Sequence, residues 1–251
     1  MLDVLYEDEH LIAVDKPAGM LVHPSWLDKQ ADQFAVSEAA KIAGQKLHTL
    51  HRLDRPTSGV LLFGKHPEVA RRMQTQFMDQ SIQKEYICIA RGWTKNEGVF
   101  DQPLKEQHDK IADKFADPDK PPQPAVTEYL KLGHTELAIP VSKYPKARYS
   151  LLLARPKTGR KHQIRRHFRK ASHHLLGDTR FGDGRHNKFF IQNFDWRELC
   201  LRSVSMTFSH PMVSDQTLVI RSGLNSTWQQ LLEQLGWQSV LDRIDKGDYQ
   251  G

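Results

Sequence analysis

The sequence is poor in cysteine and contains no long apolar run. Its 251 residues include two cysteines, Cys88 and Cys200, each within an apolar, strand-like segment. We interpret them as buried thiols, because a disulfide framework or a zinc site would need more cysteines at closer spacing. No apolar run is long enough to span a bilayer, and residues 1–9 are acidic and lack the apolar core of a secretory signal. These absences favour a cytoplasmic protein.

The sequence also lacks the residue spacings that commonly hold metals and nucleotide phosphates. His162 and His167 are five residues apart, whereas the two-histidine zinc motif places its histidines four apart on one helical face, with a glutamate between them. No glycine-rich motif of the kind that cradles phosphates is present. We therefore expect neither a metal nor a nucleotide cofactor, and no membrane partner.

What the sequence does contain is a surplus of basic residues. The chain has 36 Lys and Arg against 30 Asp and Glu, which gives a formal net charge of +6 and a pI of about 9.2. Such a surplus favours a polyanionic partner such as nucleic acid. The alternative is a basic surface that only maintains solubility.

The apolar patterning predicts a sheet with several helices, and therefore an α+β fold. Strands are expected at residues 4–6, 11–14, 20–22, 60–63, 86–90, 126–132, 136–141, 149–154, 199–208 and 218–220. Helices are expected at residues 36–43, capped by Asp32 and ended by Gly44, and at residues 67–77, 160–171 and 227–235. Residues 105–125 are polar and contain several prolines, so we expect an insertion loop there. Residues 242–251 form a polar tail that we expect to be frayed.

The most informative stretch is residues 51–59, which lead directly into an apolar run. Pro56 removes a backbone donor and Gly59 tolerates backbone angles that other residues avoid, so we expect an irregular loop before a buried strand. Asp54 is the one carboxylate of this loop, and its neighbours include His51, Arg52 and Arg55. Nearby cations favour the ionised form, and an ionised carboxylate can act as a nucleophile or general base. The alternative is a solvated loop in which Asp54 pairs with an arginine.

A turn at residues 156–159 leads into the basic helix expected at residues 160–171. Ile164 and Phe168, four residues apart, would face the core, and Arg165 lies on the neighbouring face. A solvated basic face is the usual explanation for such a run of cations. In the more specific interpretation Arg165 turns inward to pair with Asp54, while the other cations hold phosphates.

Four stretches resemble the motifs of one enzyme family. They are residues 15–19 (Asp-Lys-Pro-Ala-Gly), 51–59 (His-Arg-Leu-Asp-Arg-Pro-Thr-Ser-Gly), 84–86 (Lys-Glu-Tyr) and 159–165 (Gly-Arg-Lys-His-Gln-Ile-Arg). In this order they resemble the motifs of the RluA family of pseudouridine synthases, which act on ribosomal and transfer RNA. The resemblance extends roughly from residue 3 to residue 221.

The resemblance implies an isomerase that detaches uracil from ribose at N1 and rejoins it through C5, without a cofactor. Asp54 would be the nucleophile or the general base, Tyr86 would stack on the uracil or exchange a proton with it, and Arg165 would pair with Asp54. Arg52 would fill the space vacated by the flipped uridine, and Leu201 would form the floor of the pocket. Further RNA contacts would come from basic residues of the downstream motif and its helix, Arg160, Lys161, His162 and Arg166.

The family's fold is a mixed, largely antiparallel central sheet with flanking helices and two subdomains around a cleft. By this resemblance residues 1–241 would form a single catalytic domain, monomeric and without the small S4-like RNA-binding domain that many relatives carry at the N-terminus. Residues 111–116 and 122–127 are similar to one subfamily, which modifies uridine 65 of transfer RNA. One departure is Arg202, where relatives often have histidine.

Two alternatives to a transfer RNA enzyme remain open. The first is a ribosomal RNA pseudouridine synthase with the same chemistry, against which the insertion at residues 105–125 argues. The second belongs to a different class: a non-catalytic RNA-binding protein or RNA chaperone, which the basic helix alone would also suit.

Overall fold

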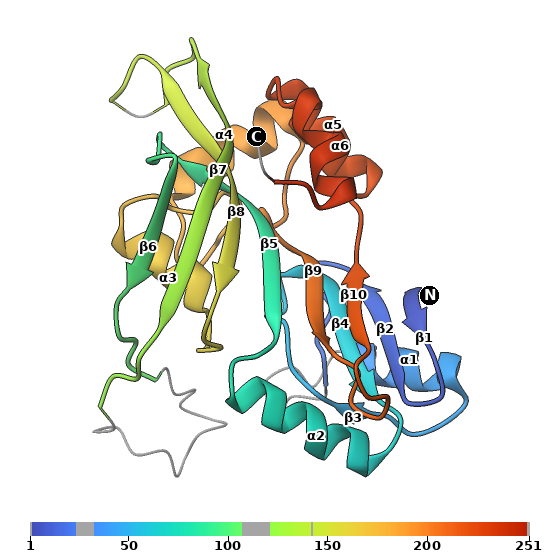
Figure 1. Ribbon diagram of the computed structural model, residues 1–251. Coiled ribbons are helices and arrows are strands. Elements are labelled where there is room, and N and C mark those ends of the chain that lie inside the picture. The colour runs from blue at the N-terminus through green and yellow to red at the C-terminus, as the bar shows by residue number, and fades with distance from the viewer. Residues whose placement is uncertain (1, 24–32, 107–120, 142, 250–251) are drawn as a thin grey trace.

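The computed structural model describes residues 2–23, 33–106, 121–141 and 143–249, and a single mixed sheet runs through them (Figure 1). The main path of the sheet follows β1 (Asp3–Glu7), β2 (Leu11–Lys16), β4 (Ser58–Gly64), β9 (Leu201–Ser209), β5 (Gln83–Arg91), β8 (Ala147–Pro156), β7 (Val126–Leu137) and β6 (Glu97–Asp101). In addition, β3 (His48–Thr49) pairs with β4, and β10 (Thr217–Arg221) pairs with β9. The β4–β9 pairing is parallel, while the other pairings between the described strands are antiparallel.

The short parallel pairing of β4 with β9 joins the two halves of the sheet. Ser58 lies opposite Arg202, and Gly59 lies opposite Ser203. Gly59 has a φ of +106°, and a Cβ added there would be 2.0 Å from the carbonyl oxygen of Ser203. Only glycine fits so close an approach with this backbone angle. The position of Gly59 therefore fixes where the loop that carries Asp54 enters the sheet.

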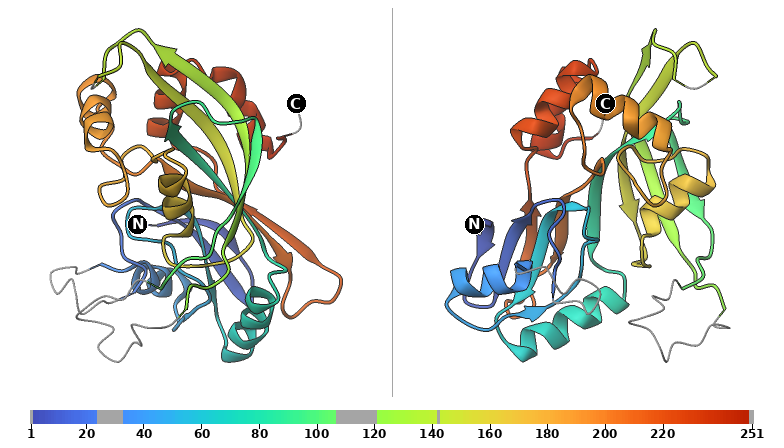
Figure 2. Two further views of the ribbon diagram at one scale, coloured as in Figure 1. Left: turned by 90° about the vertical axis from the view of Figure 1, so that its left-hand side faces the viewer. Right: turned by 180° about the vertical axis from the view of Figure 1, so that it is seen from behind.

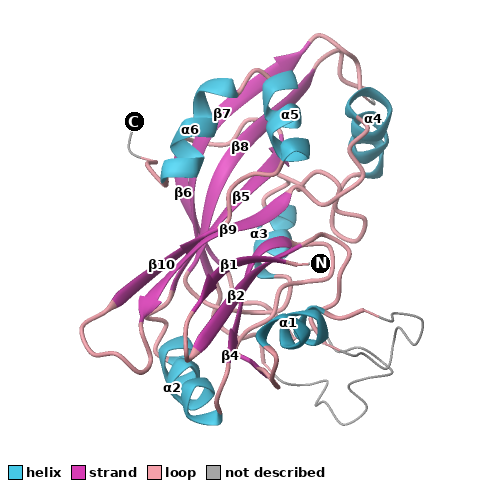
Figure 3. Cartoon of the chain, turned by 90° about the vertical axis from the view of Figure 1, so that its right-hand side faces the viewer, coloured by secondary structure: helices cyan, strands magenta, loops and turns pink. Residues whose placement is uncertain are grey.

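Six helices within the described residues pack on the sheet. They are α1 (Ala35–Ala43), α2 (Pro67–Met78), α3 (Gln163–Lys170), α4 (Gly184–Phe194), α5 (Ser226–Gln234) and α6 (Gln238–Lys246). Helices α1 and α2 lie at the end of the molecule formed by β1, β2 and β4, whereas α4, α5 and α6 lie at the opposite end, with α3 between them (Figures 2 and 3). No helix among the described residues is both long enough and apolar enough to cross a bilayer.

Three apolar clusters bury these helices. Val69 and Met73 of α2 are fully buried against β2, β4, β9 and β10, as the apolar stripe of that helix predicts. Ile164 and Phe168 of α3 share a second cluster with α1 and one face of the sheet, and α4, α5 and α6 share the third. Burial of each such side chain stabilises the fold by about 1.5–3 kcal/mol. Helix α3 thus packs on the core through its apolar side, and basic residues of its other sides, such as Arg165 and Arg166, line a cleft.

The predicted α+β fold with its largely antiparallel sheet is confirmed, and so are the two cysteines, which are buried and unpaired. The helix expected at residues 36–43 is present as α1 and ends at Gly44, whose φ is +65°. Its predicted cap is wrong, because Phe34 occupies the N-cap position without a side-chain hydrogen bond. Asp32 itself lies outside the described residues.

Three further predictions of local structure are wrong. Residues 20–22 form no strand beyond a single bridge between Leu21 and Phe34. In place of the two strands expected at 126–132 and 136–141 there is one strand, β7, because an irregularity near Gly133 breaks the alternation without ending the pairing with β8. It ends at Leu137, so residues 138–140 form no strand. The tail is not frayed up to residue 249, because α6 continues to Lys246 and both Ile244 and Tyr249 are buried. Val240 and Ile244 of α6 are four residues apart, which is helical spacing, but most of the residues around them are polar. The polar composition of the segment therefore hid its packing against the core.

Candidate active site

A cleft of about 830 Å³ is lined by residues from both halves of the sheet. Its wall combines the loop before β4, the end of α2, the start of β5 and the segment from the end of β8 into α3. The volume lies within the range of sites that enclose a small molecule or a single nucleotide. All nine predicted site residues line this cleft: Arg52, Asp54, Tyr86, Arg160, Lys161, His162, Arg165, Arg166 and Leu201.

The loop that carries Asp54 is held in place by the turn that follows β2. The backbone N–H of Gly19 donates to the carbonyl of Arg55 at 2.8 Å, and Nε of Arg55 donates to the carbonyl of Gly19 at 2.9 Å. The fully buried Lys16 donates from Nζ to the carbonyls of Pro17, Met20 and Arg55 at 2.9, 2.9 and 3.2 Å. Burial lowers the pKa of Lys16 to about 7, although the carboxylate of Asp54 opposes this change. The motif at residues 15–19 therefore acts as a support for the Asp54 loop.

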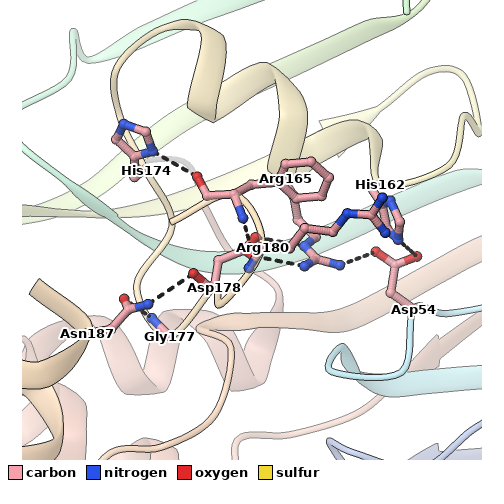
Figure 4. Close-up of polar contacts among 9 residues, drawn as sticks. Asp54, His162, Arg165, His174, Gly177, Asp178, Arg180 and Asn187 are labelled. Atoms are coloured by element: carbon pink, nitrogen blue, oxygen red, sulfur yellow. Dashed lines mark hydrogen bonds and ion pairs between the residues drawn. The ribbon is translucent and has the colours of Figure 1, made fainter. Parts of the chain in front are cut away.

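Arg165 joins two carboxylates, and Figure 4 shows it between them. Its Nη1 donates to Oδ2 of Asp54 at 3.1 Å, while Nε and Nη2 donate to Oδ2 and Oδ1 of Asp178 at 2.7 and 2.9 Å. The predicted pairing of Arg165 with Asp54 is thus confirmed. Burial by itself would lower the pKa of Arg165, but Asp178 and Asp54 together raise it, so the guanidinium stays charged. A two-pronged contact with Asp178 fixes its plane and leaves one nitrogen for Asp54.

Asp178, whose side chain is completely buried, lies in a stretch, residues 178–183, that resembles a loop of the RluA family but to which the sequence assigned no role. Its Oδ1 also accepts from the backbone N–H groups of Arg180 and Phe181 at 2.9 and 2.8 Å. Burial would raise the pKa of Asp178, but the contacts with Arg165 and these N–H groups lower it. A carboxylate this well satisfied is a fixed anchor for Arg165. In the sequence Asp178 directly follows Leu175, Leu176 and Gly177. That position suggests a buried aspartate but does not show that its partner is Arg165.

Asp54 itself is only partly covered. Its side chain is 19% exposed, so one carboxylate oxygen contacts Arg165 while the group stays accessible from the cleft. His162 Nε2 lies 3.8 Å from its other oxygen. Burial lowers the pKa of His162 to about 4 in spite of the attraction of Asp54, so His162 is neutral at pH 7. Arg165 is therefore the cation in direct contact with Asp54.

The sequence-based interpretation of the cations beside Asp54 needs correction. His51 turns into the interior, where its Nε2 accepts from the backbone N–H of Leu62 at 3.0 Å. Burial lowers the pKa of His51 to about 3, so it carries no charge at neutral pH. Arg55 reaches back to Gly19, and Arg52 is exposed at the cleft. The direct partner comes from a helix 111 positions away in the sequence.

Tyr86 and Leu201 come from neighbouring strands, β5 and β9, and both are buried at the cleft wall. Burial raises the pKa of Tyr86 to about 12, so its phenol stays protonated at neutral pH. It offers a ring face and a hydroxyl, and Leu201 offers an apolar surface beside it. Together they suit a flat, partly polar ring that enters the cleft next to Asp54.

Two of the predicted RNA-binding cations also hold the ends of the insertion. Nε of Arg160 donates to the carbonyl of Pro124 at 3.1 Å, and Nη2 of Arg166 donates to the carbonyl of Lys105 at 2.8 Å. These contacts place both described ends of the insertion beside α3. Residues 107–120 lie outside the described part of the chain. Arg160 remains exposed and Arg166 half-buried, and both line the cleft.

The chain is similar to known proteins over most of its length. Residues 10–170 match the model of the family described as RNA pseudouridylate synthase, so the chain belongs to that family. The match confirms the resemblance that the four motifs indicated. Among curated relatives, tRNA pseudouridine synthase C of Salmonella typhi is 48% identical and covers 99% of this chain and 95% of its own length. The protein of the same name from Vibrio cholerae is also 48% identical, over 96% of this chain and 98% of its own length.

Solved structures show the same fold at lower identity. Human RNA Pseudouridylate Synthase Domain Containing 1 matches with a TM-score of 0.69 and 17% identity, covering 94% of this chain and 95% of the other. Human RNA Pseudouridylate Synthase Domain Containing 4 has the same TM-score with 22% identity, covering 93% of each chain. At these identities the likeness concerns the fold alone.

Proposed function

We propose that this protein is a transfer RNA pseudouridine synthase in which Asp54 performs the catalytic step. The observation that carries this proposal is the ion pair of Asp54 with Arg165 in a cleft of nucleotide size, with Tyr86 and Leu201 beside it. A carboxylate that is paired on one side and open on the other can attack or accept a proton. Membership of the pseudouridylate synthase family supplies the reaction class.

The proposed reaction is an isomerisation with no net gain or loss of atoms. The uridine first leaves its helical stack, at a cost of a few kcal/mol, and Arg52 occupies the vacated space. The bond from ribose C1′ to uracil N1 breaks, the uracil turns, and C5 forms the new bond to C1′. The proton on C5 is then released, and N1 acquires one. Asp54 either attacks as nucleophile and is released when C5 bonds to the sugar, or removes the proton from C2′ and later returns it, and both routes use the same carboxylate.

The remaining groups have distinct roles in this proposal. Arg165 orients Asp54, and Tyr86 stacks on the uracil while its protonated hydroxyl is available to donate or relay a proton. Leu201 supports the other side of the ring. The exposed Arg160 and the half-buried Arg166 at the cleft bind phosphates without reading sequence. All of this chemistry comes from side chains, and no cofactor is required.

We infer that the substrate is transfer RNA, and specifically uridine 65. Curated relatives of nearly the same length carry the name tRNA pseudouridine synthase C, and residues 122–127 resemble the uridine 65 subfamily. Residues 111–116, which carry the rest of that resemblance, lie outside the described residues. The monomeric state and the cytoplasmic location stay predictions from the sequence.

The proposal is tested with transfer RNA that carries tritium at uridine C5. Wild-type protein is expected to release tritium, because C5 loses its proton on forming the new bond, and Asp54→Ala is expected to release none. Asp195→Ala is the matched control, since Asp195 is an exposed residue 84% accessible to solvent at the end of α4. Equal release by wild type and Asp54→Ala would end the proposal. Unchanged RNA-dependent function in cells that carry Asp54→Ala would instead support the non-catalytic RNA-binding alternative.

Mapping modified sites in cells that lack the protein identifies the substrate. Loss of pseudouridine at position 65 of transfer RNA is the expected result. Loss at a ribosomal site with transfer RNA unaffected would move the substrate assignment to ribosomal RNA and leave the chemistry in place.

A further inference from the structure

Lys84 is a cation in the cleft to which the reaction described above gives no role. It lies on β5, two residues before Tyr86, and lines the same cleft. Residues two apart on a strand project on the same side, about 6–7 Å from each other. Lys84 therefore stands one side-chain spacing along β5 from the ring expected to stack on the uracil. Its side chain is half-buried, with its charge close enough to disfavour protonation of His51.

Lys84 differs from the two nearby lysines Lys16 and Lys157 in having no partner among the described residues. Lys16 donates to three carbonyls, and Lys157 at the same cleft pairs with Glu128 at 2.9 Å. Within the described part of the chain, Lys84 has neither an ion pair nor a hydrogen bond. Burial lowers its pKa, and no neighbouring carboxylate opposes that change.

A partly buried ammonium without a counter-charge is costly in the free protein. The cost is removed when a ligand brings an anion to the ammonium, so such a residue is expected at a position that the ligand fills. Lysine acts as a compact point charge and tolerates several approach directions, which suits a phosphate oxygen. In RNA the phosphates are the anionic groups, and each nucleotide carries one on either side of its ribose.

We propose that Lys84 binds a backbone phosphate of the RNA strand that enters the cleft, directly next to the uridine held by Tyr86. This inference rests on the proposed function in one respect, that the occupant of the cleft is RNA. Lys84 is then a positioning residue: it fixes the ribose of the target relative to Asp54 without touching the reacting atoms. The exposed cations Arg160 and Arg52 contact RNA from the cleft surface, whereas Lys84 holds the strand from a partly buried position.

The test is the salt dependence of RNA binding. Lys84→Met removes the charge and keeps the length of the side chain, and the probe is a fluorescently labelled, unmodified transfer RNA transcript. The slope of log affinity against log salt concentration is expected to become shallower by about 0.7–0.9, the contribution of one phosphate contact. Lys84→Arg is expected to restore the slope. Lys246→Met, at the exposed end of α6, is the control and should leave the slope unchanged.

A second measurement distinguishes a phosphate from the uracil carbonyls. Neutral methylphosphonate linkages are placed on either side of the uridine, and one of them is expected to weaken wild-type binding but not binding by Lys84→Met. Circular dichroism checks that the variants fold, and Lys84→Gln serves if the methionine variant does not. An unchanged salt slope in the charge-removing variants, or equal weakening of wild type and Lys84→Met by both methylphosphonates, would overturn the inference.

The binding assay does not depend on turnover. If the wild type binds the transcript but releases no tritium from C5, the proposed function fails while the slope comparison still decides the role of Lys84. If tritium is released and the slopes of wild type and Lys84→Met coincide, the proposed function stands and the role of Lys84 is wrong. Absence of binding by the wild type, together with absence of release, would reject both.

Discussion

Asp54 with Arg165 and Asp15 with Arg202 are two aspartate–arginine pairs in one molecule, and their surroundings differ. Arg165 uses two nitrogens for the buried Asp178 and offers the third to Asp54, which lines the cleft. Arg202 is 2% exposed and lies outside the cleft wall; it donates to Asp15, to the hydroxyl of Ser222 and to the carbonyl of Gly223.

The two carboxylates differ in position and not in pairing or exposed fraction: Asp54 is 19% exposed and lines the cleft, whereas Asp15 is 22% exposed and lies outside the cleft wall. The Arg202 contacts tie β2 to β9 and to the chain that leaves β10, so their effect is on stability. The Arg165 contacts present a charged oxygen of Asp54 to a space that a nucleotide can enter. Both pairs depend on the parallel β4–β9 pairing, because Arg202 sits opposite Ser58 at the start of β4, directly after the Asp54 loop.

The largest effect is expected from Arg202→Leu. Removal of one partner of a buried ion pair costs up to about 3–5 kcal/mol, and here Arg202 is buried while Asp15 is 22% exposed. The free energy of unfolding, measured with urea and circular dichroism, is expected to fall by this amount, while the reaction rate of the folded protein is retained. Arg197→Leu is the control, since Arg197 and Asp195 form an exposed pair worth about 0–1 kcal/mol. A large loss of rate in stably folded Arg202→Leu would contradict the structural role.

A smaller effect is expected from Arg165→Lys. An ammonium cannot bridge Asp178 and Asp54 as the planar fork does, so Asp54 loses its orientation. A displacement of about 1 Å in a catalytic group can cost about 100-fold in rate. The single-turnover rate of tritium release at saturating RNA is expected to fall by about this factor.

Arg169→Lys, one turn further along α3, is the control for this change, because Arg169 is exposed at the helix end. Its rate should remain that of the wild type. Equal rates for wild type and Arg165→Lys at saturating RNA would mean that the pair does not position Asp54.

The smallest effect expected is a fall in the free energy of unfolding at acidic pH. It comes from a buried histidine, His186, and not from either arginine pair. Burial lowers the pKa of His186 to about 4, and its Nδ1 contacts the hydroxyl of Tyr149 at 2.9 Å. In the unfolded chain the same histidine has a pKa of about 6.5. Between these values the unfolded state binds more protons, so the free energy of unfolding falls as the pH is lowered through that window, and the contribution is intact above it.

Thermal unfolding measured from pH 7.5 to pH 4.5 checks this expectation. The melting temperature of the wild type should fall with decreasing pH, and that of His186→Gln should fall less. A pH profile identical in wild type and variant would assign the acid sensitivity to other groups.

Much of the site could be predicted because its chemistry is carried by short local strings. Asp54, Tyr86 and Arg165 each lie in a motif with characteristic neighbours, and an apolar strand or helix follows or contains each one. The helix positions of Val69 and Met73 were likewise fixed by spacing. These inferences needed no knowledge of which segments meet in space.

Residue type and periodicity indicated which residues could do chemistry and where most of the strands and helices lie, because both signals act over a few positions. The folded chain was needed to show that His51 turns inward and that Asp178 anchors Arg165. It was also needed to show that Lys16 donates to three carbonyls while Lys84 has no partner among the described residues. The direction of a side chain and the burial of its charge depend on segments distant in sequence. A motif therefore identifies the candidate residues of the site, and the packing around each residue sets its charge and the direction of its side chain.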